Sequence, residues 1–155
     1  MSTQHHNDLR ALIEAGWKVD GAGTRPPPTL LTRYRWLPSA VIAFLESFDS
    51  AVAPDETLWL LSGWDYSGES ESAFAWNEFE SLSLRSADDD PEWREEIVAF
   101  WDDHFPLALS VRSGFEHFSL QRDGRTVVHG SGPEFEETEP FAEGLDEFLE
   151  FLGSF

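Results

Sequence analysis

The chain has no cysteine, a single lysine (Lys18) and no long apolar run. Without cysteine it has neither a disulfide framework nor a thiolate site. Its longest apolar run, AVIAFL at residues 40–45, is far shorter than the roughly 20 residues that a membrane-spanning helix needs. The start, MSTQHHNDLR, lacks the charged and apolar regions of a signal peptide. These absences predict a cytoplasmic protein with no membrane partner.

Basic residues are also scarce, because 10 Lys and Arg side chains stand against 30 Asp and Glu side chains, for a formal net charge of −20. Residues 1–36 hold five bases and three acids, and residues 37–155 hold five bases and 27 acids. Affinity for nucleic acid comes largely from Lys and Arg side chains at phosphates, so the composition argues against nucleic acid as a partner. A basic protein or a cation remains compatible with the charge.

The chain does have enough hydrophobic residues to form a core. Hydrophobic residues make up 41% of its 155 residues and aromatic residues 14%, which argues against intrinsic disorder. The length fits one domain over residues 1–155, with residues 1–8 expected to be frayed.

Apolar periodicity predicts an α+β fold, in which helices pack around a mostly antiparallel or a mixed sheet. Helices are expected over residues 9–17, 38–52 and 139–153, and over a stretch that starts at Asp90 and Pro91. Their inward faces include Ile13, Val52, Trp93 and Phe141. Strands are expected at residues 57–61, within residues 72–84, and in a meander at 107–111, 115–121 and 125–129. Asp123-Gly124 suits its hairpin turn, and loops are expected at residues 20–28 and 63–70.

No motif in the sequence points to catalysis. His104, His117 and His129 lack metal-ligand spacing and fit the surface of a sheet, although His117 and His129 could meet across neighbouring strands. The acids of residues 88–92 lack the pattern of a calcium loop. No G-x-S-x-G or S-x-x-K motif is present, and with this many carboxylates a suitable pair carries no information. We therefore expect no enzyme, no metal and no cofactor.

The most unusual stretch is PEFEETEP, residues 133–140, because it holds four carboxylates and no Lys or Arg follows Arg125. On a helix over residues 139–153, Glu139, Glu143 and Glu147 would repel one another by roughly 0.2–0.5 kcal/mol per pair. Glu147 and Glu150 would also oppose the helix macrodipole. Two explanations stay open: an acidic bias across the proteome of a salt-adapted organism, or a surface for a basic partner.

A second candidate lies in the loop GWDYSGES. Its aromatic residues fit neither a strand nor a helix stripe, so they either anchor an interface or fold back onto the core. Together the two stretches give a predicted partner-binding set of Trp64, Asp65, Tyr66, Glu69, Glu71, Glu134, Glu136, Glu137 and Glu139.

The stretch HFPLALSVRSGFEHFSLQRDGRTVVHGSGPEFEETEPFAEGLDEFLEFL resembles the C-terminal half of the SUKH superfamily (Smi1/Knr4-type domains). There, strands with a Gly-aromatic start and a Gly turn are followed by an acidic loop and a final helix. The Pro-led helix LPSAVIAFLESF and the strand TLWLL extend the likeness over residues 9–152. One departure is FDSAVAPDE, where members often have an Asn-Gly turn.

The resemblance implies an α+β fold with a mixed sheet, and a binding role without shared catalytic residues. Many bacterial members are immunity proteins that neutralise toxins of polymorphic secretion systems, and others are regulatory scaffolds. The leading hypothesis is thus an immunity protein, a monomer or weak dimer, that binds a basic toxin domain such as a nuclease. The alternative is a regulatory scaffold without a toxin partner.

Overall fold

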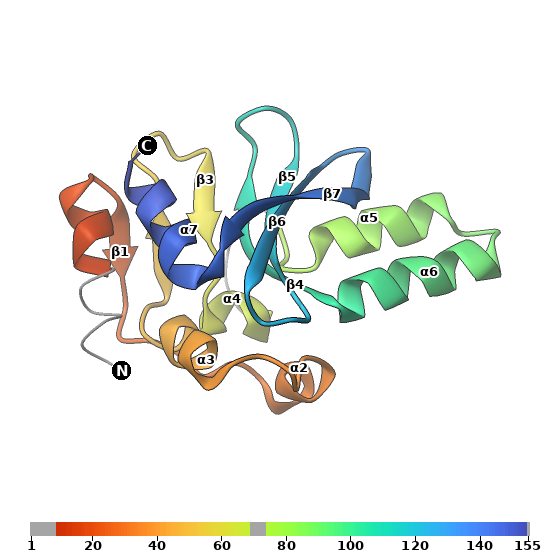
Figure 1. The fold of residues 1–155 in the computed structure, drawn as a ribbon, viewed down its shortest axis with the longest axis horizontal. Coiled ribbons are helices and arrows are strands. Elements are labelled where there is room, and N and C mark those ends of the chain that lie inside the picture. Colours follow the sequence, from red (N-terminus) through yellow and green to blue (C-terminus); the bar gives the residue numbers. More distant parts are fainter. Residues whose placement is uncertain (1–8, 69–73, 155) are drawn as a thin grey trace.

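The fold is a single antiparallel sheet with helices on both faces. The computed structural model describes residues 9–68 and 74–154. Within them the strands follow chain order across the sheet, each antiparallel to the next (Figure 1). The strands are β1 (Lys18–Asp20), β2 (Ser50–Val52), β3 (Leu58–Leu60), β4 (His104–Ser110), β5 (Glu116–Gln121), β6 (Thr126–Ser131) and β7 (Glu134–Glu143). The predicted α+β class with an antiparallel sheet is confirmed.

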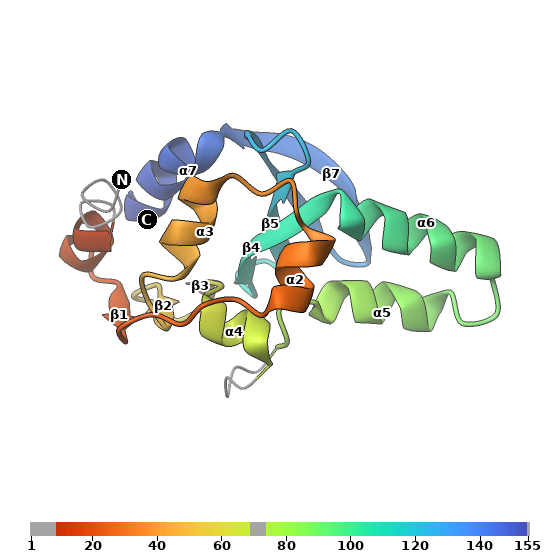
Figure 2. The ribbon, with the colours of Figure 1, turned by 90° about the horizontal axis from the view of Figure 1, so that it is seen from below.

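Helices lie between β1 and β2 and between β3 and β4, and one more helix follows β7. After a first helix over residues 9–14 they are α2 (Pro28–Arg33), α3 (Ser39–Leu45), α4 (Gly63–Ser67), α5 (Glu78–Ser86), α6 (Pro91–Asp102) and α7 (Gly144–Gly153). Neighbouring residues of β5 show how the layers are arranged. Phe118 packs on Phe148 of α7, whereas His117 packs on Phe79 of α5 and Trp101 of α6. Since successive side chains of a strand point to opposite faces, α7 covers one face and α5 with α6 the other (Figure 2).

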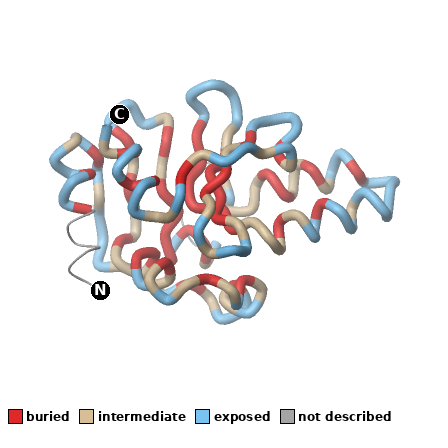
Figure 3. Tube along the Cα trace, viewed as in Figure 1, coloured by how far each residue is buried: buried red, intermediate tan, exposed pale blue. Residues whose placement is uncertain are grey.

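The central meander of β4, β5 and β6 is confirmed. Asp123 accepts hydrogen bonds from the backbone N–H of Arg125 and Thr126, and Gly124 has a φ of 73°, the left-handed conformation that such a turn needs. Buried residues run through these strands, with Phe105, Leu120 and Val127 fully enclosed (Figure 3). These strands are short, apolar-rich runs bounded by turn residues, so the sequence pattern and the tertiary environment agree.

An ion-paired arginine joins three of the helices. Arg33 of α2 donates two hydrogen bonds to the Glu80 carboxylate, at 3.0 and 2.8 Å, and one to Asp102 at 2.8 Å. Burial acts to lower the pKa of Arg33, but the bonds to Glu80 and Asp102 outweigh it and the pKa rises. The guanidinium therefore stays charged and ties α2 to α5 and α6.

Several predicted elements are wrong. Strands are expected within residues 72–84, but residues 78–84 belong to α5, whose buried Phe79, Glu80 and Ser83 follow a helical spacing. The helix expected over residues 38–52 ends at Leu45, and its predicted inward residue Val52 lies in β2. The loop expected at residues 20–28 includes the end of β1 and the start of α2. Short strands of three residues carry too little periodicity to be separated from neighbouring helices and loops.

Two predicted inward side chains face solvent instead. Ile13 and Trp93 are 53% and 44% exposed, while their neighbours Leu12, Ile97 and Trp101 are buried. The buried faces of these two helices are thus narrower than the sequence suggests.

The C-terminal helix is shorter than predicted and its charges are placed differently. Residues 134–143, including Glu139, Phe141 and Glu143, form β7 rather than the start of a helix. In α7, Glu147 lies in the first turn, where the macrodipole favours a carboxylate, and it accepts a hydrogen bond from the backbone N–H of Glu143. The expected stack of three glutamates on one helix face is therefore absent, and so is the cost assigned to Glu147.

Candidate functional site

The acidic stretch lies at the edge of the sheet. β7 pairs with β6 on one side, with His129 opposite Glu139, and it is the last strand in the sheet order. Glu134, Glu137 and Glu139 are exposed. The sequence therefore identifies three carboxylates that are open to solvent, but on an edge strand rather than on the expected loop and helix.

Glu136, which the sequence predicts as a partner contact, is held by hydrogen bonds within the protein. Its carboxylate accepts hydrogen bonds from the Ser83 hydroxyl of α5 at 2.7 Å and from the Trp101 indole N–H of α6 at 2.9 Å. One strand residue thus connects β7 to both helices on that face of the sheet. Both partners are far from Glu136 in sequence, so no local pattern could have revealed them.

The loop predicted at residues 63–70 is also wrong in part, because residues 63–67 form helix α4. Asp65 is buried and completes a capping box with Ser62, whose backbone N–H donates to the Asp65 carboxylate at 2.9 Å. Tyr66 is buried as well, and its hydroxyl donates to the backbone oxygen of Pro106 at 2.6 Å. The signal for this helix was readable, since Ser and Asp three residues apart are a helix-start signature.

Trp64 is 42% exposed, so of the two alternatives that the sequence leaves open for its side chain, the structure shows the exposed one. Figures 1 and 2 place α4 apart from the turn between β6 and β7, so the structure does not bring Trp64 together with the exposed glutamates. Glu69 and Glu71 lie outside the described residues.

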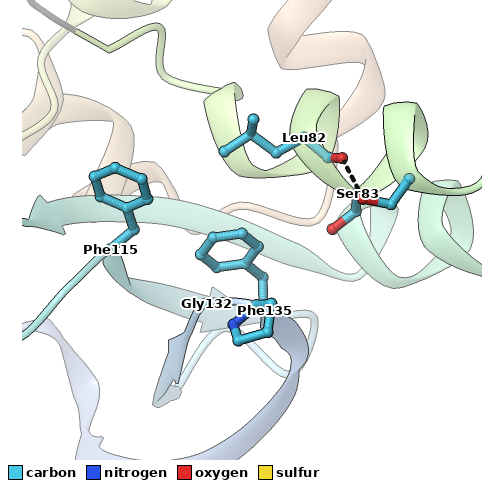
Figure 4. A pocket seen from close by; sticks show the side chains of 7 residues that line it. Leu82, Ser83, Phe115, Gly132 and Phe135 are labelled. Carbon is cyan, nitrogen blue, oxygen red and sulfur yellow. Dashed lines mark hydrogen bonds between the residues drawn. The ribbon is translucent and has the colours of Figure 1, made fainter.

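A pocket that the sequence did not indicate opens beside the start of β7. Its volume is about 340 Å³, and it lies between α5, the β4–β5 turn and the β6–β7 turn (Figure 4). The lining residues are Leu82, Ser83, Ser86, Phe115, Gly132, Pro133 and Phe135. Most of these groups are apolar, and Pro133 is followed directly by the exposed Glu134. We call this hollow the hairpin pocket.

Aromatic stacking holds the walls of the hairpin pocket. Phe135 stacks on Phe79 with ring centroids 4.3 Å apart and an interplanar angle of 4°. Phe115 contacts Phe79 and meets Phe74 edge-on at 5.2 Å, yet remains 45% exposed. A fixed aromatic wall that is only half covered is suited to receive an apolar side chain of another molecule. The sequence predicts Phe115 as the first residue of a strand, whereas β5 begins at Glu116 and Phe115 belongs to the turn before it.

Behind the hairpin pocket lies His117, which the sequence wrongly places on the sheet surface. The ring is fully buried: Nε2 lies 2.8 Å from the Phe135 backbone oxygen, and Nδ1 lies 2.8 Å from the Ser119 hydroxyl. The carbonyl can only accept, so Nε2 carries the proton and Nδ1 accepts from Ser119. Burial lowers the pKa of His117 to about 4, which keeps the ring neutral.

His129 points to the opposite face from His117, so the two rings do not share a site. In the β5–β6 register Phe118 is opposite His129 and Gly130 is opposite His117. His129 Nε2 lies 2.6 Å from a Glu116 carboxylate oxygen. Across residues 9–68 and 74–154, no group of three or more His, Asp or Glu side chains is arranged to hold a metal ion.

The described helices include none with the length and apolar character needed to cross a membrane. Comparison of the chain with protein-family models, with curated proteins and with solved structures finds no match.

Proposed function

We propose that this chain is a protein-binding module whose β7 edge and hairpin pocket dock a basic protein. One observation carries the proposal: an apolar pocket of about 340 Å³, walled by the half-exposed Phe115, opens beside an edge strand with three exposed glutamates. An apolar anchor site with charged residues at its rim is the usual anatomy of a protein interface.

The charge selects the kind of partner. Among the described residues, no Lys or Arg forms an ion pair with Glu134, Glu137 or Glu139, and the His129 ring lies 4.0 Å from the Glu139 carboxylate. An uncompensated negative surface accelerates association with a positively charged partner and repels acidic ones. The hairpin pocket would then supply affinity through apolar burial, while the glutamates supply orientation and rate.

The exposed glutamates of β7 also have a purely structural explanation. Charged residues on an edge strand prevent the free edge from pairing with another chain, and Pro140 in the same strand acts in the same direction. This explanation gives no reason for the exposure of Phe115 or for a pocket beside it. The pocket therefore favours a binding role over edge protection alone.

Within this role we favour an immunity protein that neutralises a basic toxin domain such as a nuclease, whose cleft must be cationic to hold phosphates. The support is the SUKH-like order of sequence segments over residues 9–152 and the charge of the β7 edge. One segment behind that resemblance differs in the structure, since the expected acidic loop is strand β7. The partner class therefore rests mainly on the surface.

We expect Phe115→Ser to weaken binding of the protein encoded by the neighbouring gene by roughly tenfold or more, because a central aromatic anchor is lost. Isothermal titration of the two purified proteins measures this. Trp93→Ser is the matched control, since Trp93 has nearly the same exposure, 44% against 45%, but lies on α6 and does not line the hairpin pocket.

Equal affinity of the two variants would contradict the role of the hairpin pocket. Co-expression in cells adds a biological readout: if the neighbouring gene encodes a toxin, this chain should restore growth and the Phe115 variant should not. Absence of both a complex and rescue would count against the immunity role.

A further inference from the structure

A second hollow lies on another side of the molecule. Positively charged arginine side chains line it, whereas negatively charged glutamates lie beside the hairpin pocket. The volume of this second hollow is about 420 Å³, and its lining residues are Arg25, Pro28, Leu31, Thr32 and Arg35. They belong to α2 and the residues on either side of it, which Figure 1 places far from the β6–β7 turn. None of the described residues that line this hollow carries a carboxylate, and we call it the arginine hollow.

The two arginines are notable because acids are in threefold excess. Within the part of the chain that the structure describes, six bases contact a carboxylate: Lys18, Arg33, Arg85, Arg94, Arg112 and Arg122. Arg25 and Arg35 form no ion pair with any residue that the structure describes. Arg10 and Arg125 likewise form no ion pair with a described residue, but Arg25 and Arg35 line one hollow together, in a chain of net charge −20.

The backbone that carries both arginines is held in place. The Thr24 hydroxyl donates to Asp49 at 2.7 Å, Pro26 is buried, and the backbone of residues 24 and 25 packs against Gly63. On the other side Arg35 follows the buried Tyr34, and its Nε approaches the Thr32 backbone oxygen at 3.5 Å. The two side chains are exposed but start from fixed positions, so little backbone ordering is needed when they bind a ligand.

We infer that the arginine hollow binds a small organic phosphate monoester. Two guanidinium groups match the two negative charges of a phosphate monoester, and arginine donates to phosphate oxygens in a bidentate geometry. Leu31 and Pro28 provide an apolar surface for the organic part. A polymeric phosphate such as nucleic acid would extend into the field of a molecule with net charge −20, whereas a compact dianion remains within the roughly 8 Å screening length around the hollow.

The test is a titration of the full chain with phenyl phosphate, followed by ¹H–¹⁵N NMR spectra. Saturable shifts are expected for amides within residues 25–35, and the double variant Arg25→Gln/Arg35→Gln should bind at least about tenfold more weakly. Arg125→Gln is the matched control, because Arg125 is also exposed and forms no ion pair with a described residue, but lies outside the hollow. It should leave the affinity unchanged.

Two further probes define the ligand class. Inorganic phosphate should bind the arginine hollow more weakly than phenyl phosphate does, and benzoate, with a single charge, should bind more weakly still. The inference is overturned if no saturable shift occurs at residues 25–35, if the double variant binds like the wild type, or if benzoate binds as well as phenyl phosphate.

Discussion

Replacing Gly63 with alanine is expected to lower the free energy of unfolding by about 4 kcal/mol or more, or to prevent folding altogether. A Cβ at Gly63 would lie 1.6 Å from the backbone oxygen of Thr24 and 2.7 Å from its carbonyl carbon. These are backbone atoms, so a side-chain rotation cannot relieve the clash. The segment also cannot simply retreat, because Asp49 accepts from the Thr24 hydroxyl and, through its backbone oxygen, from the Ser62 hydroxyl.

Urea denaturation of the wild type and the Gly63→Ala variant measures this loss. The control is Gly153→Ala at the end of α7, where a Cβ would meet no atom within 4 Å. That variant should be as stable as the wild type or more stable by up to about 1 kcal/mol, because alanine favours a helix over glycine. If the free energy of unfolding of the Gly63→Ala variant is within about 1 kcal/mol of the wild-type value, residues 24 and 25 do not pack on α4 as described.

Acid is expected to destabilise the fold through His117. Its pKa is about 4 in the folded chain against about 6.5 for an unperturbed histidine, so the unfolded chain binds the extra proton first as the pH falls. The neutral ring's contribution is complete above about pH 6.5 and is lost as the pH falls through about 4. Between about pH 7.5 and pH 5 the loss from this one residue is about 2 kcal/mol.

The variant His117→Gln isolates the loss of stability that comes from protonation of His117. The glutamine amide can still donate to the Phe135 oxygen but does not titrate. All carboxylates are shared by the two proteins, so their titration cancels in the difference. The stability difference between wild type and variant should shrink by about 2 kcal/mol on going from pH 7.5 to pH 5. Parallel stability curves over this range would mean that His117 is not buried as a neutral ring.

The sequence predicts those parts of the fold in which local pattern and tertiary environment agree. The β4–β6 meander is such a case, since the short apolar-rich runs and the Asp123-Gly124 turn specify the same hairpin. Strand β7 is the opposite case. Its glutamates and its position before an amphipathic helix suggest loop and helix, and only pairing with β6 makes it a strand. Such pairing depends on residues elsewhere in the chain and overrides local preference.

The candidate site was predictable in part for the same reason. Glu134, Glu137 and Glu139 are exposed as expected, because a run of carboxylates without nearby bases seldom enters a core. Glu136 looks identical in sequence but is fixed by Ser83 and Trp101, which lie 53 and 35 positions away. The hairpin pocket joins α5 to two turns of the sheet, so it exists only after folding.

The most direct test of the binding role compares two sets of three charge changes. Glu134→Gln/Glu137→Gln/Glu139→Gln neutralises the β7 edge, and Glu92→Gln/Glu95→Gln/Glu96→Gln removes the same charge from exposed positions on α6. Both variants are titrated against the protein encoded by the neighbouring gene, and their sedimentation is recorded. We predict that the β7 variant binds at least about tenfold more weakly, a loss of about 1.4 kcal/mol, while the α6 variant changes affinity by less than about threefold. A β7 variant that binds as tightly as the α6 variant but self-associates would contradict the account and assign the glutamates to edge protection.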